Sequence, residues 1–262
     1  MLNVGFSIAQ LEFFLLILVR MTGLFILSPI FGQRNVPAVF KIGFSLFLTV
    51  ILINILPDTN IEYMNNIFEY ALFIVKELAV GAILGYVTYA VISGLYIAGQ
   101  IIDMQLGFGI SNVMDPMTNI QVPLTSNFYY IYTLLIFLML NGHHMIIEAL
   151  FASFNVIPVG NISEFGSNFL PQVIKLMSEM FIIAVRIAAP IIAAIFIVDI
   201  VLGVLSRTMP QMNVFMLGMP IKIVVGFLIM IITVIAGVGI AQGIVSIMQE
   251  QIAAFLAVMA GG

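Results

Sequence analysis

The chain has no cysteine, and only 8% of its 262 residues are charged. Without cysteine, disulfide bonds, thiolate metal sites and cysteine nucleophiles are excluded. A typical globular domain carries about 25% charged residues, so this composition excludes an ordinary soluble domain. The net charge of -4 is spread over few groups, and it provides neither a basic patch for nucleic acid nor a polybasic tail for a membrane surface.

The chain consists mostly of long apolar runs. Hydrophobic residues make up 63% of the chain, and its mean hydropathy is +1.23. A helix needs about 20 apolar residues to cross a bilayer. The runs 11–31, 70–102, 173–206 and 223–259 reach or exceed that length, 39–56 comes close to it, and 128–154 is an interrupted stretch. The sequence therefore predicts an all-α, polytopic integral membrane protein with long, kinked helical hairpins. Pro190 lies where it would kink one of them.

Ionisable residues inside these runs need partners. Arg20 lies near the middle of the first run, where exposure to lipid would cost about 2.5–3.5 kcal/mol. We therefore expect it to face protein, a cavity or a carboxylate, either as an anchor between helices or with a direct role in transport. Lys76 and Glu77 are adjacent, so on a helix they point in different directions and each needs its own partner.

Small residues are dense in the run over 70–102. Gly81 and Gly85 are four residues apart, a spacing that allows the backbones of two helices to approach closely. Since glycine inside a helix costs about 1 kcal/mol relative to alanine, this density favours tight packing or a bend.

The interval 99–123 is the longest without a sustained apolar run. It contains no lysine or arginine, and glycines and methionines alternate with amides and small apolar residues. Glycine gives backbone freedom, and methionine fills irregular gaps. Such a segment suits a plug or seal, but a re-entrant or interfacial connector without a moving part fits equally well. Either arrangement requires surrounding protein or a water-filled cavity.

A histidine pair lies in the interruption at 141–144. His143 and His144 follow Asn141, and Glu148 lies four residues after His144. A zinc site usually takes three or four protein ligands, and the chain has neither an HEXXH motif nor a second cluster. A structural Asn/His turn is therefore preferred over a metal site, and we expect no metal or other cofactor.

Three polar blocks carry a family resemblance. GQIIDMQLGFGISNVMDP (99–116), LNGHHMIIEALFASFNVIPVG (140–160) and SRTMPQMNVFMLGMPIKIVVG (206–226) resemble the FliR family of the flagellar type III export gate. The resemblance covers nearly the whole chain, including Arg20, Pro29, Pro37 and Lys41.

The resemblance implies a non-enzymatic subunit in the bacterial inner membrane, within the flagellar basal body. It implies assembly with FliP and FliQ beside FlhB and FlhA, and passage of unfolded flagellar proteins through the assembled gate. The chain would form one membrane domain over 1–262, with a FliP-like part over about 1–172 and a FliQ-like hairpin over about 173–259 whose tip is at 210–215.

The same resemblance implies site residues. It places a pore plug over 106–122, including Leu106, Gly107, Phe108, Gly109, Ile110, Met114, Asp115, Pro116 and Met117. Structural or assembly roles are expected for Arg20, Lys76, Glu77, Asp103, Asn141, His143, His144, Arg186, Pro210, Asn213 and Lys222.

Three other functions are weighed against this one. The export-gate subunit of a virulence injectisome shares the architecture, but the NGHH block and the overall match favour the flagellar branch. A self-sufficient small-molecule transporter would show repeated halves and a site of ionisable residues at mid-membrane, and the sequence shows neither. An intramembrane hydrolase would need a nucleophile and base or a metal motif, which the histidine pair alone does not supply.

Overall fold

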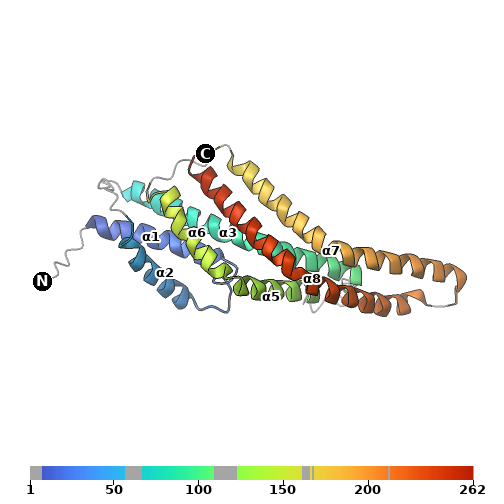
Figure 1. Cartoon of the computed structure of the whole chain (residues 1–262). Helices are drawn as coiled ribbons and strands as arrows, with labels where there is room; N and C mark the ends of the chain where they lie inside the picture. Colours follow the sequence, from blue (N-terminus) through green and yellow to red (C-terminus); the bar gives the residue numbers. More distant parts are fainter. Residues whose placement is uncertain are drawn as a thin grey trace. The chain divides into compact units, whose positions relative to one another are not determined.

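The computed structural model describes residues 8–56, 67–108, 123–160, 166, 168–211 and 213–261. All regular secondary structure in these residues is helical (Figure 1). The helices are α1 (Ile8–Leu27), α2 (Ala38–Ile53), α3 (Ile67–Leu106), α5 (Leu124–Met139), α6 (Gly142–Val156), α7 (Phe169–Thr208) and α8 (Val214–Met259). The prediction of an all-α chain is confirmed.

Four stretches of these helices are long and apolar enough to cross a membrane: Gln10–Leu27, Ile67–Leu106, Phe169–Thr208 and Met216–Ile235. Helices α5 and α6 meet at a bend of 70° and would add a fifth span if they count as one. The prediction of a polytopic membrane protein agrees with this arrangement.

Three helices are much longer than a bilayer requires. Helices α3 and α7 each have 40 residues, and α8 has 46. At 1.5 Å per residue they extend over about 60–70 Å, about twice the thickness of a hydrocarbon core. The overlong runs in the sequence are therefore continuous helices. Pro190 lies inside α7, and Pro220 lies inside α8.

The last apolar run of the sequence begins at 223, but α8 already begins at Val214. Asn213 caps this helix: its side-chain oxygen accepts a hydrogen bond from the backbone N–H of Met216 at 3.2 Å. Pro220 lies inside α8 and has no N–H, so the backbone bond to the Met216 carbonyl is absent there.

Contacts divide the chain into two compact units. Unit 1 comprises Met1–Ala90, Asn141–Leu176 and Ser246–Gly262, and unit 2 comprises Val91–Leu140 and Met177–Val245. The boundaries between them fall inside α3, α7 and α8 and at the junction of α5 and α6.

In unit 1, α3 packs closely against α1. A Cβ atom at Gly81 would overlap the Arg20 carbonyl, and one at Gly85 would lie 2.6 Å from the Leu24 carbonyl oxygen. The reverse contact comes from Gly23, whose Cβ would lie 2.7 Å from the Leu78 carbonyl oxygen. The close helix approach predicted from the Gly81–Gly85 spacing is confirmed.

In unit 2, helices also pack closely at glycine residues. A Cβ at Gly94 of α3 would lie 3.0 Å from the Met180 carbonyl oxygen of α7, and one at Gly226 of α8 would overlap the side chain of Leu106. Tyr132 of α5 donates a hydrogen bond to the Val234 carbonyl of α8 at 2.8 Å. Within this unit α3 thus packs against α7 and α8, and α5 packs against α8.

Candidate functional site

The predicted plug begins at the C-terminal end of α3, in unit 2. Gly107 has a φ of 88°, a left-handed conformation that favours glycine. Its N–H donates to the Met104 carbonyl at 3.2 Å, and the Phe108 N–H donates to the Asp103 carbonyl at 3.1 Å. This pair of bonds is a Schellman motif. It ends α3 at a defined residue, so Leu106 belongs to the helix and Phe108 to the segment that leaves it.

Most of the predicted plug lies outside the described residues. Of its members, the structure describes Leu106, Gly107 and Phe108. The others fall in 109–122, namely Gly109, Ile110, Met114, Asp115, Pro116 and Met117.

The two ends of this segment are joined by one carboxylate. Asp103, in the last turn of α3, accepts a hydrogen bond from the Thr125 backbone N–H at 3.0 Å. Its second oxygen accepts from the backbone N–H and the hydroxyl of Ser126, each at 3.3 Å. The first N–H groups of a helix have no partner within the helix and attract negative charge. Asp103 therefore caps the start of α5 and fixes it beside the end of α3.

Backbone proximity supports this cap. A Cβ atom at Gly99, one turn before Asp103, would overlap the backbone of Ser126. Helix α5 therefore begins at Leu124, four residues before the apolar run that predicted it at 128. The sequence could not reveal this start, because the group that satisfies these amides comes from another helix.

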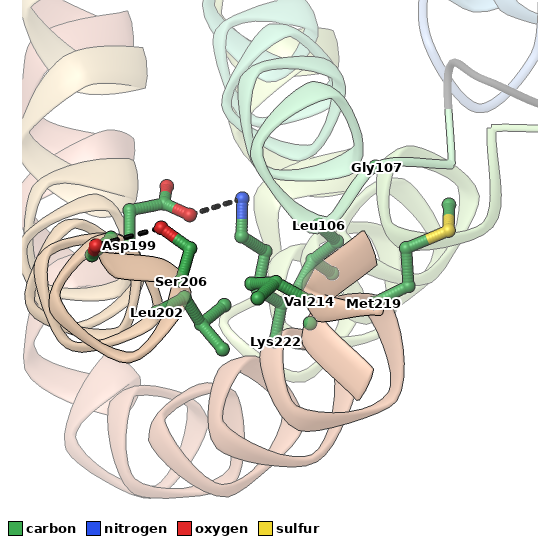
Figure 2. Close-up of a pocket in the computed structure, with 10 residues that line it drawn as sticks. Leu106, Gly107, Asp199, Leu202, Ser206, Val214, Met219 and Lys222 are labelled. Carbon is green, nitrogen blue, oxygen red and sulfur yellow. Dashed lines mark hydrogen bonds and ion pairs between the residues drawn. The ribbon is translucent and has the colours of Figure 1, made fainter. Parts of the chain in front are cut away.

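A cavity of about 330 Å³ adjoins the end of α3. Leu106 and Gly107 line it together with residues of α7 and α8 near their connection (Figure 2): Asp199, Leu202, Gly203, Ser206, Val214, Gly218, Met219 and Lys222. Leu106 is buried, and its side chain occupies the space that the absence of a side chain at Gly226 leaves free. The base of the predicted plug thus lies beside the C-terminal part of α7 and the N-terminal part of α8.

An ion pair closes one side of this cavity. Lys222 of α8 lies 2.5 Å from an Asp199 oxygen of α7 (Figure 2). The two residues are far apart in the chain and no local spacing relates them, so the sequence does not predict their pairing. Of the two other residues expected at this end of the hairpin, Asn213 caps α8 as described above, and Pro210 lies in the turn between the helices.

We expect the Asp199–Lys222 pair to contribute only modestly. Its side chains are 43% and 24% exposed, and ion pairs of this kind are worth about 0–1 kcal/mol. Lys222→Ala should lower the unfolding free energy of the detergent-solubilised protein by no more than about 1 kcal/mol. The exchanged pair Asp199→Lys with Lys222→Asp should recover most of the loss. A loss several times larger, without recovery in the exchanged pair, would contradict this assignment.

A buried ionic network lies in unit 1. The Arg20 guanidinium is fully buried, and its Nε donates to an oxygen of Glu77, also fully buried, at 2.5 Å. Its Nη1 donates to the Ile157 carbonyl at 2.9 Å and to the Ser153 hydroxyl at 3.3 Å. The guanidinium carbon lies 4.2 Å from the centre of the Phe154 ring, a distance that gives a favourable cation–π contact. Arg20 thereby connects α1, α3, α6 and the residue after α6.

The second Glu77 oxygen extends this network. It accepts a hydrogen bond from the Gly160 backbone N–H at 3.0 Å, and Gly160 has a φ of 80°. The expectation that Arg20 faces protein and a carboxylate agrees with this geometry, as does the expectation that Glu77 and Lys76 have separate partners. Lys76 lies 5.9 Å from the centre of the Phe73 ring.

The histidine pair lies at the bend between α5 and α6. Asn141 has a φ of 57°, a left-handed conformation that asparagine tolerates, and α6 begins at Gly142. The His143 and His144 rings, whose centres are 4.3 Å apart, are therefore in the first turn of a helix rather than in the preceding turn. Among the described residues, no three His, Asp or Glu side chains gather as metal ligands.

Arg186 is the last of the predicted structural residues. It lies within α7 and is exposed, in contrast to Arg20. Sequence reasoning also missed Thr125 and Ser126, the partners of Asp103. The only signal available for them was that they lie between Pro123 and the apolar run that begins at 128.

The sequence matches a known protein family and its members. The family described as "Bacterial export proteins, family 1" matches residues 11–248. The chain is 39% identical to the flagellar biosynthetic protein FliR of Bacillus subtilis over 251 residues, which cover 94% of this chain and 95% of the relative.

More distant relatives include both flagellar and virulence proteins. The chain is 28% identical to the flagellar biosynthetic protein FliR of Escherichia coli over 214 residues, covering 81% of this chain and 80% of the relative. It is also 28% identical to the surface presentation of antigens protein SpaR of Shigella flexneri over 232 residues, covering 88% and 83%. The 39% identity to the Bacillus subtilis protein supports the flagellar branch.

Proposed function

The chain belongs to the FliR family of bacterial export proteins, and we propose that residues 106–122 plug the conduit of a flagellar type III export gate of which it is a subunit. The protein is a membrane component of the flagellar export apparatus rather than an enzyme. In this proposal, residues 106–122 close the gate, and the ends of α3 and α5 anchor this segment.

The Asp103 contact carries this proposal. One carboxylate holds the last turn of α3 and the first turn of α5 together. The two ends of the segment between these helices are therefore anchored close to each other. Gly107 ends α3 sharply, and Leu106 is buried beside Gly226. A segment with a fixed base can be displaced without unfolding the helices that hold it.

The energy of the plug itself favours reversible closure. Fixing a backbone costs about 1–2 kcal/mol per residue, so a segment of this length stays in place only through many small contacts. Its methionines and glycines suit such contacts. An entering polypeptide can replace them one after another, whereas a lock built from buried ion pairs would have to be broken at once.

We further propose that FliP, FliQ, FlhB and FlhA are its partners and that unfolded flagellar proteins pass through the assembly. Residues of about 1–172 would correspond to a FliP-like part and those of about 173–259 to a FliQ-like hairpin. The hairpin proposal is supported by α7 and α8, two long helices joined by the short connection between Thr208 and Val214. The virulence equivalent remains the second candidate, but a 39% identical flagellar relative favours the first.

Deleting 107–121 tests the plug directly. We expect cells that carry the assembled deletion complex to admit small solutes through the gate when no substrate is being exported, because the obstruction is gone and Asp103 is kept. The measurement is uptake of a small membrane-impermeant dye, or loss of ion gradients, with partner co-purification as the check on assembly.

A matched variant distinguishes two roles of this segment: obstructing the conduit and linking α3 to α5. Replacing the same segment by a glycine–serine linker of equal length keeps α3 and α5 joined but removes the methionine contacts. It should leak as the deletion does. Unchanged permeability in both assembled variants would exclude residues 106–122 as the plug.

A further inference from the structure

One face of α8 contacts both helices that carry the ends of the proposed plug. Gly226 and Thr233 are seven residues apart in α8, so they lie on the same side of the helix about two turns from each other. Met230 lies between them on this side and is buried. We call Gly226, Met230 and Thr233 the α8 inner face. They belong to unit 2, as do the end of α3 and the start of α5.

Gly226 leaves a notch that the end of α3 fills. A Cβ atom at Gly226 would overlap Cδ2 of Leu106 and would lie 3.5 Å from its Cγ. Ile195 of α7 borders the same notch, because its Cδ1 would lie 3.7 Å from that Cβ atom. Leu106 and Ile195 are both buried. Since Gly107 follows Leu106 directly and ends α3, the Gly226 notch fixes the residue from which the plug leaves the helix.

Thr233 and its neighbour contact the first half of α5. The hydroxyl oxygens of Tyr129 and Thr233 are 3.4 Å apart, and the Tyr132 hydroxyl donates to the Val234 carbonyl at 2.8 Å. Asp103 joins the start of α5 to the end of α3, as described above. Helices α3, α5 and α8 therefore contact one another pairwise around the base of the plug.

The contact at the Gly226 notch differs from the other two. The contacts that α5 makes include hydrogen bonds, whereas Leu106 meets Gly226 by packing alone. Dispersion is short-ranged, and a gap of about 0.5–1 Å already removes about a quarter to a half of it. The cavity of about 330 Å³ also adjoins Leu106 (Figure 2), so this side chain has space to enter. A small shift of α8 would therefore release Leu106 before it breaks a hydrogen bond.

We propose that the α8 inner face controls the plug: the gate is closed while Leu106 lies in the Gly226 notch, and a shift of α8 that empties the notch frees the base of the plug. The proposal rests on the proposed role of residues 106–122, and it assigns the regulation of the plug to a helix outside that segment. Gly226 is a positioning residue, since it acts through Leu106.

Gly226→Ala tests the notch. The added methyl group overlaps Cδ2 of Leu106, and the adjoining cavity lets that side chain leave while α8 stays folded, because alanine favours a helix more than glycine does. We expect cells with the assembled variant to take up a small impermeant dye severalfold faster than the wild type when no substrate is being exported. Gly203→Ala is the matched control: Gly203 lines the same cavity, but its Cβ would meet nothing within 4 Å, so that gate should stay closed.

A second substitution in the same chain should reverse this leak. Leu106→Val removes the terminal carbons that the new methyl group overlaps, so the combination of Gly226→Ala and Leu106→Val should close the gate again. A general loss of stability at Gly226 would not be reversed by shortening a side chain on another helix. Leu106→Ala empties the notch from the other side without any overlap and should also leak. A closed gate with Gly226→Ala or with Leu106→Ala, or a leak that Leu106→Val does not reverse, overturns the proposal.

A thiol label measures the base of the plug without reference to leakage. The chain has no cysteine, so Phe108→Cys places a single one directly after Gly107. In the purified complex we expect Gly226→Ala to make maleimide labelling of this cysteine severalfold faster, and Gly203→Ala to leave it unchanged. Faster labelling together with a deletion of 107–121 that does not leak would refute the plug alone. A leaking deletion with unchanged labelling in Gly226→Ala would refute the control by α8 alone.

Discussion

Glu77→Ala is expected to lower the unfolding free energy by about 3–5 kcal/mol, the usual cost of leaving one member of a buried ion pair without the other. Arg20 and Glu77 are both fully buried, so water cannot replace the lost carboxylate. The substitution also removes the acceptor of the Gly160 N–H. Chemical unfolding of the detergent-solubilised chain, followed by its helical circular dichroism, measures the loss.

An exposed ion pair in the same unit provides the control. Lys175 and Glu250 lie 3.5 Å apart with side chains that are 51% and 66% exposed, so Glu250→Ala should cost at most about 1 kcal/mol. Glu77→Gln keeps an oxygen for Gly160 but loses the charge, and we expect it to fall between the two alanine variants. If Glu77→Ala and Glu250→Ala lower the unfolding free energy equally, burial does not determine how much the Arg20–Glu77 pair contributes to stability.

The position of Arg20 also predicts how its loss affects function. Its contacts join α1, α3 and α6 within unit 1, and none of them involves the predicted plug. Arg20→Ala should therefore reduce assembly with partner subunits more than it reduces export by the complexes that do form. Normal recovery of partners together with poor secretion would instead assign Arg20 a direct role in transport.

The sequence predicted which residues need partners better than it predicted the partners. An arginine within an apolar run must face protein, because the cost of exposing it to lipid is large, and Gly81 and Gly85 predict close packing through their spacing alone. These inferences need only one helix. Arg20 and Glu77 are 57 positions apart in the chain and lie on different helices. No pattern in a single sequence predicts that they pair.

Helix ends show the same limit. The last apolar run of the sequence begins at 223, yet Asn213 caps α8 and the helix starts at Val214, before Pro220. The start of α5 depends on a carboxylate from α3. The Asp103 bonds join two helices, and no local pattern indicates them. The Asn213 cap is local, and an asparagine ahead of a helix is a sequence signal for it.

Asp103→Ala is expected to loosen the base of the proposed plug. Asp103 accepts hydrogen bonds from the buried backbone N–H groups of Thr125 and Ser126. Each buried donor left without a partner lowers stability by about 1–3 kcal/mol. The start of α5 would fray, since no residue within α5 can satisfy its first N–H groups. We expect the assembled variant to admit small solutes when no substrate is being exported, measured by the same dye uptake as for the deletion.

Ser126→Ala is the matched control for this substitution. It removes only the hydroxyl bond to Asp103 and keeps both backbone amide bonds, so the gate should stay closed. Leakage with Asp103→Ala but not with Ser126→Ala would locate closure in the carboxylate that joins the two helix ends. A tight Asp103→Ala gate, beside a leaking deletion of 107–121, would mean that the plug is held by its own contacts and needs no fixed base.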